Sequence, residues 1–192
     1  DFAQETKCYV PAINLHGVGS LVTNNEIYNA PHAAILLGGQ MNTIELNKIH
    51  DVCLETADSG AIYGHGNFEA AGNIIRYNLF ENIDRKGSQD TSVYTNNAIY
   101  LDMLLSNTSV YGNIFSKCES AVLFNGGRSN MFYNNIIADC EKSLTISNIG
   151  QWDDYPHAVE EMVDRFEENN PYYKNDIWKE KFPSLYNLRE DE

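Results

Sequence analysis

An internal repeat built on asparagine constrains the fold more than any other feature of this sequence. The motif is Asn-x-(Ile/Phe), followed some residues later by a small residue and two apolar ones. It recurs from Asn25, Asn47, Asn78, Asn113 and Asn135. Successive copies are 22, 31, 35 and 22 residues apart. A period of about 22 residues is typical of a solenoid, in which each unit stacks on its neighbours.

A second short apolar run completes each unit. It reads Ala34-Ile35-Leu36, Ala61-Ile62-Tyr63, Ala98-Ile99-Tyr100, Ala121-Val122-Leu123 and, more loosely, Ser143-Leu144-Thr145-Ile146. Two such runs per unit are too short for helices and suit strands, and the Asn and Gly residues around them suit turns. We therefore expect an all-β, right-handed parallel β-helix, a solenoid of about five coils over residues 9–150. A leucine-rich repeat is the main rival, but its Leu-x-x-Leu-x-Leu frame is absent from the sequence.

Stacked coils place like residues on like, at a spacing of roughly 4.8 Å. We expect the recurring asparagines to form an inward ladder whose amides hydrogen-bond along the stack. The two long intervals imply loops near Thr56–Ala71 and Asp84–Tyr94. Because these loops belong to adjacent coils, we expect them to project side by side, and long loops on a rigid scaffold often carry function.

The pattern changes after Gly150. Pro156–Glu168 has the apolar spacing of an amphipathic helix, Pro171 ends it, and Tyr172–Leu188 is rich in aromatic and apolar residues. We expect residues 151–192 to form a helical and irregular cap packed over the last coil, because the open end of a β-helix is an unpaired edge.

The N-terminal end shows no comparable cap. The core residues predicted for the first coil, Ile13, Leu15 and Leu21, would then be partly exposed. We expect the chain either to self-associate through this end or to be the C-terminal portion of a longer parent whose coils cover it.

The composition limits the possible partners. There are 27 acidic residues against 13 basic ones, for a net charge of −14, whereas nucleic acids require a basic footprint. We therefore expect neither a nucleic acid nor a membrane as a partner. A membrane-spanning helix is also not expected, because no run of 18 apolar residues occurs. The four cysteines contain no Cys-x-x-Cys pair, so a zinc site is not expected. We also expect no other metal site and no cofactor. Cys118 and Cys140 are expected to stack in adjacent coils, as thiols or as a disulfide.

The expected strands also predict a surface row of polar residues. If Ile62 and Ile99 point inward, alternation sends Tyr63, His65, Tyr100 and Asp102 outward. The residues three positions past the central apolar residue are Gly38, His65, Asp102 and Asn125 in successive coils. Aromatic rings beside carboxylates suit a sugar ring, which needs stacking and acid–base groups. We therefore predict that a glycan binds through Tyr63, His65, Tyr100, Asn125 and Arg128.

Two aspartates are the catalytic candidates. Asp102 follows an apolar strand, and Asp58 stands before Gly60; each could instead be a turn residue. Glycosidases need two carboxyl groups about 5–10 Å apart, and adjacent coils could supply that distance. Arg128, after two glycines, could bind a substrate carboxylate or hydroxyl, or form a salt bridge at a tight turn.

Several runs resemble secreted bacterial β-helix proteins of the pectate-lyase-like superfamily, and are most similar to glycoside hydrolase family 141. They are Pro11–Gly19, Asp58–Tyr63, Gly72–Asn78, Ala98–Asp102 and Asn125–Arg128. The resemblance implies fucosidase- or xylanase-type hydrolysis, a secreted or periplasmic location, and a catalytic pair at Asp58 and Asp102. The chain departs from the family at His65, where an Arg-Asp-Trp run is usual, and at Met103, where a second Asp is common.

Three functions remain open from the sequence. The first is hydrolysis of a plant or algal polysaccharide by the Asp58–Asp102 pair. The second is a non-catalytic glycan-binding or scaffold module, which the departures from the family favour. The third is a calcium-dependent lyase or epimerase acting on uronates, which the scaffold allows, although fold alone is a weak guide to reaction.

Overall fold

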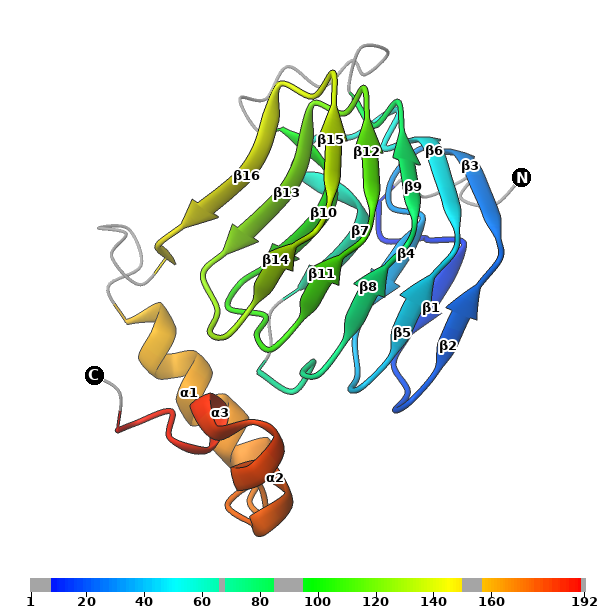
Figure 1. Cartoon of the computed structure of the whole chain (residues 1–192). Helices are drawn as coiled ribbons and strands as arrows, with labels where there is room; N and C mark the ends of the chain where they lie inside the picture. Colours follow the sequence, from blue (N-terminus) through cyan, green and yellow to red (C-terminus); the bar gives the residue numbers. More distant parts are fainter. Residues whose placement is uncertain (1–7, 66–67, 85–94, 150–156, 191–192) are drawn as a thin grey trace.

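The computed structural model describes residues 8–65, 68–84, 95–149 and 157–190. Within these ranges the chain forms three parallel sheets that run side by side along one axis (Figure 1). Each coil gives one strand to each sheet in turn, so five coils follow one another and β16 begins the next. The expected parallel β-helix of about five coils is therefore confirmed.

The strands fall into three sets. Sheet 1 contains β1 (Ile13–Leu15), β4 (Ile35–Leu37), β7 (Ser59–His65), β10 (Asn96–Asp102), β13 (Ser120–Asn125) and β16 (Lys142–Ser147). Sheet 2 contains β2 (Leu21–Thr23), β5 (Thr43–Glu45), β8 (Ile74–Arg76), β11 (Ser109–Tyr111) and β14 (Met131–Tyr133). Sheet 3 contains β3 (Glu26–Ala30), β6 (Lys48–Val52), β9 (Leu79–Glu81), β12 (Ile114–Ser116) and β15 (Ile136–Ala138). Three strands per coil correct the expectation of two, since sheet 2 was not anticipated.

The asparagine ladder forms as predicted, at the bend between sheets 2 and 3. The backbone N–H and the Nδ2 of Asn47 both donate to Oδ1 of Asn78 at 3.0 Å. Asn78 donates in the same way to Asn113, and Asn25 and Asn135 occupy the two ends. The three central asparagines are buried. Each buried amide therefore finds partners in the neighbouring coil, which holds the coils in register.

Apolar residues stack along the interior in the same register. Ile62 pairs with Ile99, and Ile99 pairs with Val122. The rings of Phe80 and Phe115 stack with centroids 5.1 Å apart. All five side chains are fully buried, so one continuous core runs through the coils.

The extra residues of the two long coils do not all project from the same end of sheet 1. In the third coil they are divided, with residues 53–58 before β7 and residues 66–73 after it, of which 66–67 fall outside the described residues. In the fourth coil they lie before β10, in residues 82–95, of which 85–94 fall outside the described residues. The prediction of two neighbouring loops is therefore wrong for residues 66–73. Repeat spacing reveals an insertion but not the turn that contains it.

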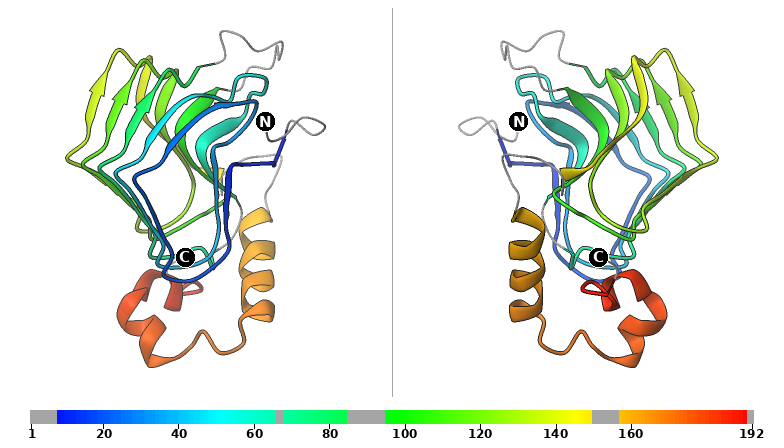
Figure 2. Two further views of the ribbon diagram at one scale, coloured as in Figure 1. Left: turned by 90° about the vertical axis from the view of Figure 1, so that its right-hand side faces the viewer. Right: turned by 90° about the vertical axis from the view of Figure 1, so that its left-hand side faces the viewer.

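Three helices follow the coils: α1 (Ala158–Asn169), α2 (Asp176–Lys181) and α3 (Pro183–Tyr186). Their apolar side chains join Phe68, Ala71 and Leu104, which belong to the turns between sheets 1 and 2. Viewed along the coil axis, the helices lie outside the outline of the coils (Figure 2). The helical segment thus packs along the flank, which corrects the prediction of a cap over the last coil.

The two end coils differ in how well they are covered. At the C-terminal end of the coils Phe132 of β14, Ile137 of β15 and Leu144 of β16 pack against the core but remain partly exposed. In the first coil Leu15 is buried, whereas Leu21 is 60% exposed because Val22, its neighbour on β2, takes the inward position. The assignment of Leu21 to the core is therefore wrong.

Candidate functional site

The outer face of sheet 1 carries the predicted row of polar residues. Asp102 on β10 pairs with His65 on β7. On the other side, Asn125 Nδ2 donates a hydrogen bond of 2.7 Å to Oδ1 of Asp102. The sequence-derived order of Gly38, His65, Asp102 and Asn125 is therefore the order of neighbouring positions across the sheet.

Asp102 is buried and held by several donors. The Tyr63 hydroxyl donates to Oδ2 at 2.9 Å, and the backbone N–H of Met103 donates to Oδ1 at 2.7 Å. Together with the Asn125 amide, these bonds fix both carboxylate oxygens. Only 7% of the residue is exposed, so its access to a ligand is narrow.

Tyr63 and Tyr100 point away from the coil core, as alternation predicts, but they do not form an open stacking surface. The two rings lie 5.2 Å apart and pack with Ala33, Leu36 and Leu123. Only 4% of Tyr63 and 5% of Tyr100 is exposed. The idea that a sugar ring stacks on their faces is corrected by this packing, which leaves the hydroxyls as their functional groups.

The two tyrosine hydroxyls stay protonated. Burial raises the pKa of Tyr63 well above its usual range, and the negative charge and hydrogen bond of Asp102 raise it further. Burial also raises the pKa of Tyr100, and the charges of Asp102 and Asp58 add to this. Both phenols therefore remain hydrogen-bond donors at any physiological pH.

Asp58 reaches the same cluster from another part of the chain. It is exposed and directly precedes β7, where its backbone adopts a left-handed conformation with φ of 53°. This conformation suits Asp and Asn better than other non-glycine residues. Since Asp58 and Asp102 both raise the pKa of Tyr100, the two predicted aspartates lie near one phenol.

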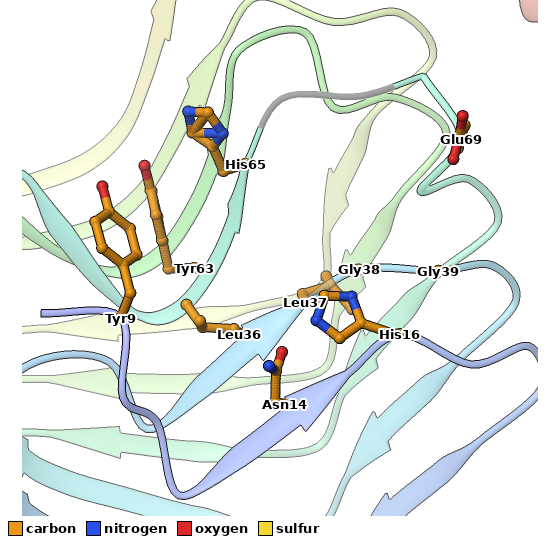
Figure 3. A pocket seen from close by; sticks show the side chains of 10 residues that line it. All are labelled: Tyr9, Asn14, His16, Leu36, Leu37, Gly38, Gly39, Tyr63, His65 and Glu69. Carbon is orange, nitrogen blue, oxygen red and sulfur yellow. The ribbon is translucent and has the colours of Figure 1, made fainter. Parts of the chain in front are cut away.

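An open groove lies beside this cluster. Its volume is about 370 Å³. Figure 3 shows Tyr63 and His65 of β7, Asn14 of β1, His16 just after β1, and Glu69 arranged around the same space. Leu36, Leu37, Gly38 and Gly39 of the intervening strand and turn, together with Tyr9, complete the lining. The Tyr63 side chain therefore contacts the groove and also binds Asp102.

A family model described as a right handed beta helix region matches residues 11–151. The matched range covers more than half of the chain and runs from just before β1 to just after β16. The chain belongs to the right-handed β-helix family. No curated protein and no solved structure matches it.

Among the groove residues of this β-helix that were missed from the sequence, Asn14 and His16 lie at repeat positions. His16 stands 22 residues before Gly38, one coil earlier, so it extends the polar row by one position. A Cβ at Gly38 would lie 3.0 Å from Nδ1 of His16, so the glycine leaves room for the imidazole. The same coil period places Asn14 beside Leu36, its partner in the sheet. Extending the period to the first coil would have found both.

Arg128 lies in a turn of the β-helix rather than on a strand. Its backbone N–H donates to Ser106 Oγ at 2.9 Å, and its carbonyl accepts from the N–H of Asn107 at 2.8 Å. Its neighbour Ser129 donates to Ser184 Oγ of α3 at 3.0 Å. The described contacts therefore place Arg128 where the coil turns meet the flanking helices.

His32 contacts Tyr63 of the tyrosine cluster. Its ring packs edge-on against Tyr63, with centroids 6.2 Å apart, and its Nδ1 accepts a hydrogen bond from the Tyr9 N–H at 3.4 Å. Burial lowers the pKa of His32 to about 4. The imidazole is therefore neutral near pH 7.

The cysteines expected to stack are thiols rather than a disulfide. Cys118 is buried and Cys140 half-buried, and both are free. In the described ranges, no three His, Cys, Asp or Glu side chains gather as metal ligands. None of the described helices combines the length and the apolar character that a membrane crossing requires.

Proposed function

We propose that this β-helix is a carbohydrate-active protein that hydrolyses a glycosidic bond of a plant or algal polysaccharide, with Asp58 and Asp102 as the carboxyl pair. The observation that carries the proposal is that both aspartates interact with one buried phenol, Tyr100. A shared neighbour of this kind supports a separation within the roughly 5–10 Å that glycosidase carboxyl pairs span. The resemblance to glycoside hydrolase family 141 at the same two positions adds to it.

The surroundings of the two carboxyl groups suggest different roles. Asp102 accepts hydrogen bonds from Tyr63, Asn125 and the Met103 N–H, which orients it to attack or to accept a proton. Asp58 is exposed, so solvent can return a proton to it between turnovers when it acts as the general acid. We assign Asp58 as the proton donor and Asp102 as the nucleophile or base.

The substrate would lie in the groove on the outer face of sheet 1. Its lining combines polar side chains, such as Asn14, His16 and Glu69, with apolar surface from Leu36. A sugar offers both hydroxyls and C–H faces, so this mixture suits it. Apart from Tyr9, the lining residues come from β1, β4, β7 and the turns that follow them, so the groove spans three neighbouring strands and can hold several linked sugar residues.

Substitution of each aspartate by asparagine tests the hydrolase. Asp58→Asn should preserve the fold because Asn also adopts the left-handed conformation at this position. Either variant should lose at least about a hundredfold in turnover, the usual size of an acid–base effect. Asp139→Asn is the matched control, since Asp139 has φ of 55° but lies beside β15. Chromatography of polysaccharide digests supplies the rates, and full activity in both variants would overturn the assignment.

A non-catalytic glycan-binding module is the second candidate. The observation that favours it is the burial of Asp102, whose two oxygens are already hydrogen-bonded. Under this alternative the protein retains oligosaccharides in affinity electrophoresis, while long incubation yields no shortened product from any of them.

A further inference from the structure

A second pocket opens where α1 packs beside the end of β7. Its volume is about 330 Å³. His65 and Glu69 line both this pocket and the groove on sheet 1, so the two spaces meet at these residues. From α1 the pocket receives Met162, Arg165, Phe166 and Asn169.

The pocket has an apolar floor and one cationic side chain. Phe68 and Phe166 are buried, with ring centroids 5.9 Å apart. Met103 and Met162 are partly buried against the same cluster. Arg165 is exposed at the rim. The partly exposed Met103 and Met162 side chains can contact the C–H face of a sugar ring, and a guanidinium can bind its charged substituent.

Arg165 is free to take a ligand. Arg76 is paired with Glu45, and Arg189 with Asp164 and Glu167. For Arg165 the described part of the chain supplies neither an ion pair nor a hydrogen bond. The forked donors of Arg165 match carboxylate and other oxyanions.

The other charged group of the pocket is already engaged. Glu69 Oε1 accepts a hydrogen bond of 2.6 Å from Asn170 Nδ2, just after α1. This bond directs one carboxylate oxygen toward the helix and leaves the other available to sugar hydroxyls. The same bond fixes the loop after β7 to α1, so the two walls of the pocket are joined.

We propose that this pocket is a subsite for an anionic sugar residue, one carrying a carboxylate or a sulfate ester, with Arg165 as the residue that binds the charge. The inference rests on the proposed function, because the ligand is a further residue of the glycan in the neighbouring groove. The flanking helices thereby gain a role in choosing the substrate.

Calorimetric titration with three oligosaccharides tests the subsite. They are a neutral xylan oligosaccharide, the same oligosaccharide bearing glucuronic acid, and a sulfated galactan oligosaccharide. The unaltered protein should bind at least one charged oligosaccharide about tenfold more tightly than the neutral one, the effect of one charge-assisted contact. The two charged ligands separate carboxylate from sulfate recognition. Raising the salt concentration should weaken the charged ligand selectively.

Two arginine variants complete the design. Arg165→Gln should abolish the preference while neutral binding persists. Arg189→Gln removes a cation facing the other side of α1 and should retain the preference. Equal binding of neutral and charged ligands, or a preference that survives Arg165→Gln, would overturn the subsite and leave the proposed function standing. Failure of the unaltered protein to bind or cleave any glycan would instead overturn the proposed function, and the subsite with it.

Discussion

The Tyr63 hydroxyl donates a hydrogen bond of 2.9 Å to Oδ2 of Asp102, across neighbouring strands of sheet 1. Tyr63 also lines the groove, whereas Asp102 is buried and is not among the lining residues. The Tyr63 hydroxyl therefore links the groove to the carboxylate, and a ligand bound in the groove would lie next to this hydrogen bond.

Removing the Tyr63 hydroxyl should reduce turnover at the site more than it reduces the stability of the fold. Tyr63→Phe keeps the buried ring but removes the hydroxyl that donates to the Asp102 carboxylate. A hydrogen bond to a charged group contributes about 1.5–3 kcal/mol. We expect a fall in turnover of roughly tenfold or more, with little change in KM. Tyr28→Phe is the control, because Tyr28 is exposed on sheet 3 and stacks on His50. Equal turnover in both variants would contradict a positioning role for Tyr63.

Stability should fall in mild acid because of His32. Its folded pKa is about 4, lowered by burial, against about 6.5 in the unfolded chain. The neutral ring thus contributes stability that is fully present above pH 6.5 and is lost as the pH falls toward 4. The shift corresponds to about 3 kcal/mol.

Chemical unfolding at a series of pH values tests this assignment. His32→Gln, which cannot gain a proton, should flatten the stability profile between pH 6.5 and 4. His157→Gln, at an exposed position before α1, should leave the profile as it was. A steep profile that persists in His32→Gln would assign the acid sensitivity to other groups.

The asparagine ladder should be most sensitive at its centre. Asn78→Ala removes an amide that bridges Asn47 and Asn113 and also donates to the Ile44 carbonyl. The buried polar groups next to Asn78 then lose their hydrogen-bond partners, which lowers the free energy of unfolding by about 2–4 kcal/mol. Asn25→Ala, at the exposed end, should lose less than about 1 kcal/mol. Urea unfolding gives both values, and equal losses would deny that burial sets the strength of the ladder.

Thiol reactivity should follow burial. Burial raises the pKa of both Cys53 and Cys118 to about 12, so almost no thiolate forms near pH 8. Cys8 is exposed. Alkylation with iodoacetamide at pH 8, followed by peptide mapping, should label Cys8 within minutes and leave the two buried thiols unmodified until the protein is unfolded. Rapid labelling of Cys118 in folded protein would contradict its stacked, buried position.

The fold was predictable because its main signal is repeated. Asn47 and Asn78 identify the coil, and the interval between them reveals the insertion. The third strand of each coil was missed although the same motif marks it: Asn42, Asn73 and Asn130 stand before Ile44, Ile75 and Phe132 of sheet 2. The next asparagine motif follows each of these three-residue strands so closely that the two motifs look like a single motif in the sequence.

The site was predicted in part, since alternation places residues on a face but says nothing about what covers that face. Asp102 and His65 were correctly aligned. The burial of Tyr63 could not be foreseen, because it depends on Tyr9 and His32, which lie outside the repeat positions. In the same way, the apolar spacing of α1 predicted a helix with one buried face but not the turns against which that face packs.

The position of the helices along the flank changes how the coils depend on one another. In a solenoid alone, each coil contacts only its nearest neighbours, so the end coils can unfold locally while the middle coils stay folded. Here Lys181 contacts Met41 of the second coil, and Phe182 packs against Gly72 of the third. Ser184 is hydrogen-bonded to Asn107 of the fourth and to Ser129 of the fifth. The helical segment therefore links four coils, so that local unfolding of any one of them destabilises the others.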